Sequence, residues 1–213
     1  MAPKLRSDGE PSLNEIFQRI LSIQEDVASI KNDMSSLKGI VTAKETKIQQ
    51  IHEAVNSLEQ RGRNQSIRIL NLKLDQETSK NAVLTSKVVY DTVLHPILNI
   101  ALQNNEIDAI PPYMSLIEYA HVLPPPKKSP DSTPVIVRLC SRLYRQIIFH
   151  NKRAFFSQNT LQGVFIVEDL TPENMRRFLK IKHDPETERA WTRMGITKYT
   201  KKSDPNKVLN FKL

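Results

Sequence analysis

The chain has 213 residues, a formal net charge of +8 at pH 7 and one cysteine, Cys140. A single cysteine excludes a disulfide framework and a multi-cysteine zinc site, and no apolar run reaches the ~20 residues that span a bilayer. Residues 1–12 lack the apolar core of a secretory signal, so we expect a soluble cytoplasmic or nuclear protein without a membrane partner.

The positive charge is concentrated in the C-terminal part of the chain. Residues 1–60 hold seven Lys or Arg against nine Asp or Glu, whereas residues 61–213 hold twenty-four against fourteen. Residues 135–213 alone hold sixteen against seven. This regional excess indicates a polyanionic partner, with nucleic acid favoured over an anionic membrane surface.

After a disordered lead over residues 1–12, a heptad repeat extends over residues 13–60. With Leu13 as position a, thirteen of the fourteen a and d positions up to Leu58 are apolar, and Lys44 is the exception. A seam this narrow requires partner helices, and its period predicts a left-handed coiled coil of roughly 70 Å. The predicted oligomerisation residues are Leu13, Ile16, Ile20, Ile23, Val27, Ile30, Met34, Leu37, Val41, Ile48, Ile51, Val55 and Leu58.

The composition of the seam favours three or four strands over two, because Ile predominates at position d. Residues at g meet residues of opposite charge at the following e position, as Asp26 and Lys31 do, which favours a parallel arrangement. Residues 19–24 resemble a trimer-specifying pattern, although Gln24 stands where that pattern has Glu. We therefore predict a parallel homotrimer, the alternatives being a tetramer and a long amphipathic helix packed within its own chain.

After the coil the spacing of the apolar residues changes, and the new pattern predicts a split βαβ domain over residues 67–168. Gly62 is expected to stop the helix, leaving a basic hinge over residues 61–66. Strands are predicted over 67–72, 116–123, 135–140 and 164–167; helices are predicted over 79–102, with a kink at Pro96, and over 141–155. The order strand, helix, strand, strand, helix, strand is the plan of ferredoxin-like and RNA-recognition domains.

A small C-terminal nucleic-acid-binding domain is expected over residues 169–213. Thr171 is a good N-cap and Pro172 suits the first helical position, so a helix should begin there and end near Lys182. Apolar and polar residues alternate in the tail from Trp191, and this pattern predicts a β-hairpin with its turn near Asp204. The predicted fold class is thus α+β: a long parallel coiled coil, a split βαβ domain and a helix-plus-hairpin domain.

Five segments of the chain together resemble the first-open-reading-frame RNA-binding protein of LINE-type retrotransposons. As in that family, the coil is followed by Arg63-Asn64 and Ile67-Arg68-Ile69. The family's second strand, third strand and start of the C-terminal domain are resembled by residues 117–122, 134–138 and 167–174, respectively. Residues 190–195 are similar to the C-terminal domain of the baculovirus few-polyhedra protein and its arthropod transposon relatives. The resemblance implies single-stranded RNA binding, ribonucleoprotein assembly and nucleic-acid chaperone behaviour during transposition.

The predicted mechanism of binding is contact between basic side chains and the phosphate backbone. The first and third strands carry no aromatic residue, so base stacking on the sheet is not expected, and binding should depend strongly on salt. Three chains joined by the coil would multiply weak contacts. The candidates are Arg61, Arg63, Arg68, Arg138, Arg142, Arg145, Lys152, Arg153, Arg176, Arg177, Lys180, Lys182, Arg193, Lys198, Lys201 and Lys202.

Little in the sequence predicts catalysis. The glycines do not cluster into a phosphate-binding loop, and the histidines lack metal-ligand spacing, so we expect no catalytic residues, no metal and no cofactor. Glu168 and Asp169 could form a metal-binding pair, but the acidic start of a helix explains them better. Trp191 could stack a base or pack in the core, and His121 is expected to be structural.

The expected function is that of a trimeric protein that binds single-stranded RNA or single-stranded DNA and acts as a chaperone. The alternative is a viral or host coiled-coil scaffold of the few-polyhedra type.

Overall fold

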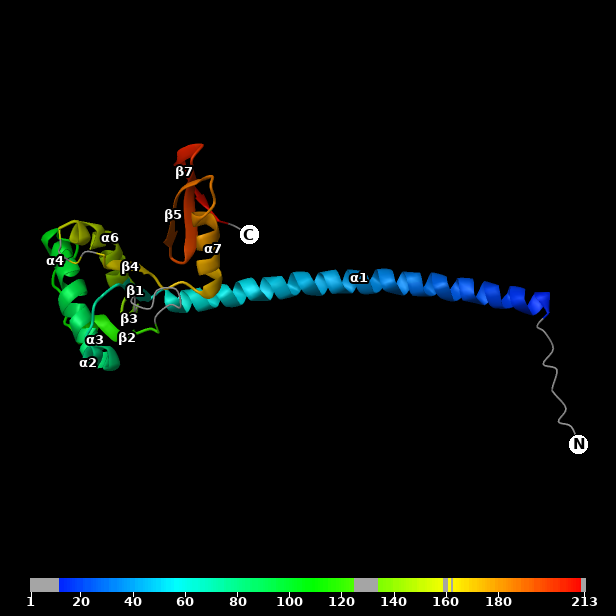
Figure 1. Cartoon of the computed structure of the whole chain (residues 1–213), viewed down its shortest axis with the longest axis horizontal. Coiled ribbons are helices and arrows are strands. Elements are labelled where there is room, and N and C mark those ends of the chain that lie inside the picture. Colours follow the sequence, from blue (N-terminus) through cyan, green and yellow to red (C-terminus); the bar gives the residue numbers. More distant parts are fainter. Residues whose placement is uncertain (1–11, 125–133, 159–160, 162, 212–213) are drawn as a thin grey trace, which may run out of the picture. The chain divides into compact units, whose positions relative to one another are not determined.

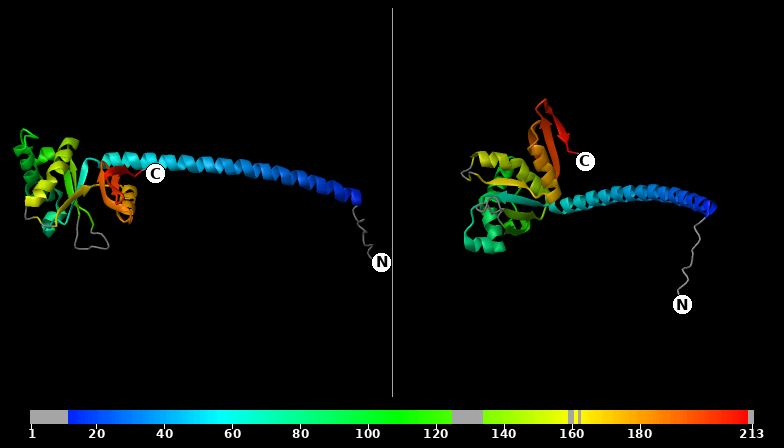
Figure 2. Two further views of the ribbon diagram at one scale, coloured as in Figure 1. Left: turned by 90° about the horizontal axis from the view of Figure 1, so that it is seen from above. Right: turned by 45° about the vertical axis from the view of Figure 1, so that its right-hand side comes forward.

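The computed structural model describes residues 12–124, 134–158, 161 and 163–211 (Figures 1 and 2). The fold is α+β, with a long N-terminal helix, a sheet-containing domain and a C-terminal three-stranded sheet. The chain divides into two compact units, residues 1–54 and 55–213. Within the described ranges, no helix has the length and apolar character needed to cross a membrane.

One helix, α1 (Leu13–Arg63), contains the entire predicted heptad repeat. It begins with a capping box: the Glu15 N–H donates to the Ser12 hydroxyl (3.3 Å), and the Ser12 N–H donates to the Glu15 carboxylate (2.8 Å). The thirteen apolar seam side chains are exposed by 41 to 87%. The described part of the first unit is thus one helix with an uncovered apolar stripe.

The helix does not stop at Gly62 as expected. α1 continues through Gly62 to Arg63, and after a two-residue turn the first strand begins at Ser66. Glycine costs only about 1 kcal/mol in a helix relative to Ala. Hydrogen bonds between Gln60 or Arg63 and residues 169–174 hold the last turns of α1 and offset that cost.

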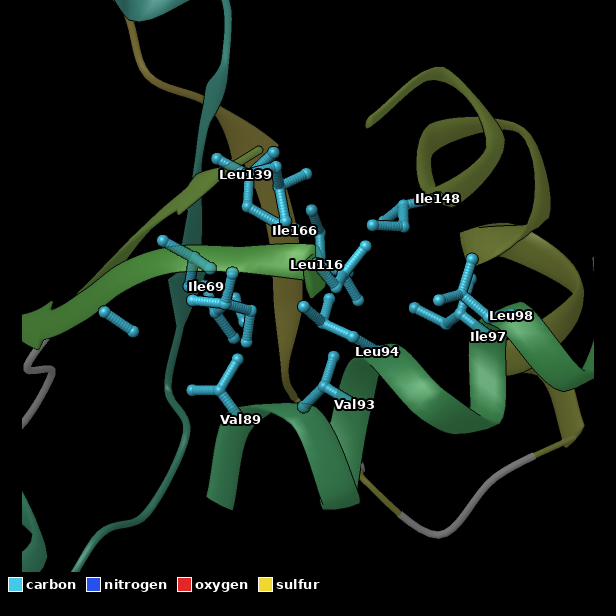
Figure 3. Packing of buried hydrophobic residues seen from close by; sticks show 14 of the residues in the cluster. Ile69, Val89, Val93, Leu94, Ile97, Leu98, Leu116, Leu139, Ile148 and Ile166 are labelled. Atoms are coloured by element: carbon cyan, nitrogen blue, oxygen red, sulfur yellow. The ribbon is translucent and has the colours of Figure 1, made fainter. Parts of the chain in front are cut away.

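Four strands form one sheet in the order β2-β3-β1-β4: β1 (Ser66–Leu70), β2 (Ile117–Val122), β3 (Val135–Leu139) and β4 (Phe165–Glu168). All three neighbouring pairs are antiparallel. Alternate residues point to one face, where Ile67, Ile69 and Val137 are fully buried. Helices cover this face and complete the core shown in Figure 3.

The helix predicted over residues 79–102 is divided into α2 (Gln76–Lys80), α3 (Ala82–Val89), a π-helical turn η1 (Tyr90–Leu94) and α4 (His95–Gln103). Asn81 separates α2 from α3, because its side chain accepts the first free N–H groups of α3. The irregularity expected at Pro96 is present as the wide turn η1 just before it. A short helix, α5 (Tyr113–Leu116), precedes β2.

The second long helix of this domain is α6 (Arg142–Gln158). Ile147, Ile148 and Phe155 are buried in the core, whereas the Leu143 side chain is 62% exposed. It lies in the first turn of α6 and lines a cleft described below, so the core does not enclose it.

The C-terminal helix is confirmed as α7 (Pro172–Lys182), with the Asn174 N–H donating to the Thr171 hydroxyl at 3.1 Å. The predicted hairpin is instead a three-stranded antiparallel sheet of β5 (Thr187–Arg193), β6 (Ile196–Lys201) and β7 (Asp204–Asn210). The turn between β6 and β7 lies at Lys202 and Ser203, directly before Asp204, so the expected turn is present within a few residues of its predicted place. Asp204 and Pro205 themselves begin β7, an edge strand, where the missing N–H of Pro205 is tolerated.

Candidate nucleic-acid interface

The end of α1 is joined to residues 169–174 by a buried hydrogen-bond network, here called the Gln60 hub (Asn56, Gln60, Asp169, Thr171 and Asn174). Gln60 Nε2 donates to the Asp169 carbonyl, and Gln60 Oε1 accepts from the Thr171 N–H and the Asn174 amide, each at 3.0 Å. Asn56 accepts from the Thr171 hydroxyl at 2.6 Å and donates to Asn174 at 3.0 Å. Every side-chain amide group of the hub has a partner, so the hub fixes the start of α7 against α1.

Gly195, in the turn between β5 and β6, lies directly against the hub. Its φ is +79°, and a Cβ added there would overlap the Gln60 side chain. Gly163 provides a matched position, because its φ is +81° but a Cβ would meet nothing within 4 Å. Both positions favour glycine, and only Gly195 also lacks space for a side chain.

We expect Gly195→Ala to lower the free energy of unfolding more than Gly163→Ala does. Both substitutions place a side chain at positive φ, which costs about 1–2 kcal/mol. Only Gly195→Ala adds overpacking, worth a further ~1–3 kcal/mol. Urea denaturation of the two variants measures the difference, and equal losses would show that Gln60 does not pack closely on this turn.

A buried ion pair holds the same turn on the four-stranded sheet domain. Glu168 Oε1, at the end of β4, accepts from Arg145 Nη2 at 2.7 Å and from the Met194 N–H at 2.8 Å. Glu168 Oε2 accepts from the Gly195 N–H at 3.0 Å. Burial raises the pKa of the Glu168 carboxyl, but the Gly195 N–H and Arg145 together outweigh it and hold the pKa below its ordinary value of 4.5.

Asp169 points away from Glu168 and pairs with two other arginines. Its Oδ1 lies 3.2 Å from Arg63 Nη1 and 2.6 Å from Arg68 Nη2. Glu168 and Asp169 therefore serve separate ion pairs, and they precede the N-cap Thr171, so explaining them as the acidic start of a helix was wrong. No group of three or more His, Cys, Asp or Glu side chains suited to a metal ion occurs among the residues that the structure describes.

A cleft of about 1020 Å³ separates α6 and β4 from α7 and β5, and it is the candidate site. Aromatic rings line it from three elements: Phe149 on α6, Phe178 on α7 and Trp191 on β5. Trp191 is half-buried and accessible from this cleft, so it is not a core residue. Accessible aromatic rings that line a cleft are surfaces on which unpaired bases stack.

Basic side chains accompany these rings. Lys182 and Arg193 line the cleft and are exposed, and Lys182 Nζ lies 5.9 Å from the centre of the Phe178 ring. Lys152 Nζ donates to the Ile166 carbonyl at 2.7 Å and lies 4.4 Å from the centre of the Phe149 ring. Burial lowers the pKa of Lys152. The exposed Lys182 and Arg193 are therefore the cleft cations best placed to meet phosphate.

The predicted basic residues do not form one continuous surface. Arg145 lines the cleft but is only 4% exposed and is paired with Glu168, so its role is structural, contrary to the expected phosphate contact.

The other predicted basic residues are distributed over several elements. Arg63 and Arg68 pair with Asp169, Arg176 and Arg177 pair with Glu173, and Lys201 pairs with Glu186. Arg61, Arg138 and Arg142 gather at the end of α1, whereas Arg153, Lys180, Lys198 and Lys202 lie on α6, α7, β6 and the turn before β7.

Sequence analysis missed the aromatic residues of the uncovered sheet face. Tyr119 and His121 on β2 are exposed on this face, so His121 is not a core residue. Only the first and third strands were considered, although the alternation within residues 117–122 already places Tyr119 and His121 on one side. Phe165 on the opposite edge strand, β4, is 56% exposed.

The candidate interface thus has a cleft with rings and exposed cations, closed at one end by the Glu168–Arg145 pair and braced by the Gln60 hub. These features come from residues far apart in the sequence, on α6, α7, β4 and β5. Comparison with models of known protein families and with curated proteins gives no match to this chain.

Proposed function

We propose that the protein is a homotrimeric single-stranded RNA-binding protein and nucleic-acid chaperone that assembles a ribonucleoprotein of the LINE-type retrotransposon kind. The observation that carries the proposal is the cleft between α6 and α7, where Phe149, Phe178 and Trp191 accompany Lys182 and Arg193. The regional excess of Lys and Arg and the resemblance of the sequence to that family support the same function.

The chemistry of the cleft favours unpaired strands and little base specificity. A duplex hides the faces of its bases, whereas a single strand can stack them on rings while Lys and Arg neutralise its phosphates. Every base has a flat face and every nucleotide a phosphate, so neither contact distinguishes one sequence from another. Binding of this kind weakens steeply with salt, because bound cations are released from the nucleic acid.

The strand order supports an RNA-recognition-like domain between the coil and the C-terminal part. In the order β2-β3-β1-β4, with every neighbouring pair antiparallel, β3 separates β1 from β2, which therefore run parallel. Two parallel strands with another strand inserted between them are the mark of the split βαβ plan. We accordingly propose that residues 67–168 form this domain.

The end of α1 is compatible with a trimeric coil. Asn56, Gln60 and Arg63, which hold residues 169–174, occupy heptad positions b, f and b on the outer side of a coiled coil. Val55 and Leu58 occupy positions a and d and are 56% and 66% exposed. Residues 169–174 therefore contact only the outer positions of the last turns of α1 and leave Val55 and Leu58 free, which is compatible with three chains binding one RNA strand with raised effective concentration.

We expect the double variant Lys182→Ala/Arg193→Ala to bind single-stranded RNA roughly tenfold more weakly at 0.1 M salt and to show a flatter dependence of affinity on salt. Fluorescence anisotropy with a labelled RNA, at several salt concentrations, measures both effects. The control is Lys80→Ala/Lys87→Ala, which removes the same charge from exposed positions on α2 and α3, outside the cleft.

Equal losses in the two double variants would show that only the overall charge matters, and would overturn the cleft as the site. A wild-type trimer that fails to bind RNA at low salt would overturn the proposed function itself. That result would favour the alternative of a coiled-coil scaffold, whose C-terminal part meets a protein.

A further inference from the structure

The face of the four-stranded sheet opposite the helices, here called the open face, carries a pair of stacked rings at its β2 edge. Tyr119 is the cross-strand partner of Arg138, and His121 is the partner of Ile136, so all four side chains lie on this face. The Tyr119 and His121 rings stack, with centroids 5.6 Å apart and an interplanar angle of 27°. Tyr119 is 38% exposed, which leaves ring surface available to a ligand.

Three arginines meet at the C-terminal end of α1, and one of them, Arg138, is the cross-strand partner of Tyr119. Arg138 Nη1 donates to the Gly62 carbonyl and Arg142 Nη2 donates to the Arg61 carbonyl, each at 3.4 Å. The two guanidinium groups thus meet consecutive carbonyls of the last helical turn, where the helix dipole favours positive charge. The side chain of Arg61 extends from the same turn.

The positive charge in this cluster exceeds the negative charge. Arg138 is paired with Glu118 at 2.8 Å. Arg61 and Arg142 are exposed, and in the described ranges neither has a carboxylate within ion-pair distance. The end of α1 therefore presents two uncompensated cations next to an exposed aromatic pair.

We propose that Tyr119 and His121 form a second nucleic-acid contact, in which unpaired bases stack on the two rings while Arg61, Arg138 and Arg142 meet the adjoining phosphates. This inference rests on the proposed function and extends it beyond the cleft. The cleft borders β4, at one edge of the sheet, and the ring pair lies on β2, at the other. Three strand spacings of about 4.8 Å separate the two edges by roughly 14 Å.

The residues of this surface favour a single nucleic-acid strand over a protein or a duplex as its ligand. The buried core of a protein–protein interface is depleted in charged residues, whereas the open face near the rings carries Arg68 and Arg138. A duplex would offer phosphates but no free base to the rings. A flat aromatic pair beside Arg138, with the exposed Arg61 and Arg142 at the adjoining end of α1, matches the two chemical features of a single strand, a base face and a phosphate.

The test compares Tyr119→Ala/His121→Ala with Tyr119→Phe/His121→Phe on two probes, oligouridine and an abasic oligonucleotide of equal length. The abasic strand keeps the phosphates and lacks the bases. We expect the alanine variant to bind oligouridine roughly five- to 100-fold more weakly than wild type and to bind the abasic strand as wild type does. The phenylalanine variant keeps the rings and should retain most of the affinity for oligouridine.

Different results would overturn this second contact alone or the proposed function as a whole. If wild type binds oligouridine and the alanine variant binds it equally well, the second contact is overturned while the cleft remains. An equal loss on both probes, with an unchanged thermal midpoint, would also overturn it, because stacking cannot weaken binding to an abasic strand. If wild type binds neither probe at low salt, the proposed function fails together with this inference.

Discussion

Replacing Ile23 and Ile30 with Asp is expected to convert the proposed trimer into monomers and to weaken RNA binding by about a hundredfold or more. Both residues occupy position d and are exposed in the single chain, by 59% and 57%. In a parallel trimer each Asp would bring three carboxylates together in the seam without partners, which is strongly unfavourable. The affinity would fall because each monomer then binds with one set of contacts.

The matched control is Ser22→Asp/Ser29→Asp, which adds the same charge one residue earlier, at position c on the outer side of the coil. It should leave the trimer and RNA binding close to wild type, apart from a small electrostatic effect. Size-exclusion chromatography with light scattering gives the mass of each variant, and fluorescence anisotropy gives its affinity for RNA. A wild-type mass of one chain would contradict the coiled coil, and a trimeric Ile23→Asp/Ile30→Asp variant would contradict the assigned seam.

Arg145→Ala is expected to lower the free energy of unfolding by about 3–5 kcal/mol, because it leaves the buried Glu168 carboxylate without its charged partner. The side chains of Arg145 and Glu168 are only 4% and 6% exposed. Arg153→Ala, at an exposed position on the same helix, removes an equal charge and should cost less than about 1 kcal/mol. Urea denaturation measures both changes.

A double variant distinguishes the effect of the lost ion pair on stability from the effect of lost packing. Arg145→Met/Glu168→Gln removes both charges, keeps much of the volume and leaves an amide oxygen that can accept from the Met194 or Gly195 N–H. It should be more stable than Arg145→Ala, since no charge is then buried alone. A double variant as unstable as Arg145→Ala would show that the loss comes from packing and not from the charge of Glu168.

The same carboxyl gives stability a defined dependence on pH. The pKa of Glu168 is lower in the folded protein than its ordinary value of 4.5. The ionised carboxylate therefore contributes stability that is fully present above the unfolded pKa and is lost as the pH falls through the folded pKa. Glu168→Gln removes this contribution, so its stability should decrease less than that of wild type over that acidic range.

Local patterns in the sequence were sufficient to predict most of the elements. The heptad repeat predicted α1 because a narrow apolar stripe at this period fits a long helix, and Thr171 and Pro172 predicted the start of α7 because capping depends on adjacent residues. Alternating apolar residues predicted the strands of the four-stranded sheet. These features need no knowledge of distant parts of the chain.

Predictions failed where a distant segment overrides a local signal. Gly62 is a helix-stopping residue by propensity, yet contacts between the last turns of α1 and residues 169–174 keep it helical. For Gly62, a few hydrogen bonds to distant residues outweigh a preference of about 1 kcal/mol. By contrast, the Asp204-Pro205-Asn206 signal lies directly after the real turn at Lys202 and Ser203, so it located the turn to within a few residues.

The sequence by itself determined that a basic C-terminal part follows a helix with an apolar seam, because charge and period are properties of the chain. Only the tertiary structure decided which cations are accessible: it buries Arg145 against Glu168 and leaves Lys182 and Arg193 at a cleft. It also brought Tyr119 and His121 onto the open face. The physical reason is that burial and pairing depend on neighbours from other elements, which composition and spacing do not specify.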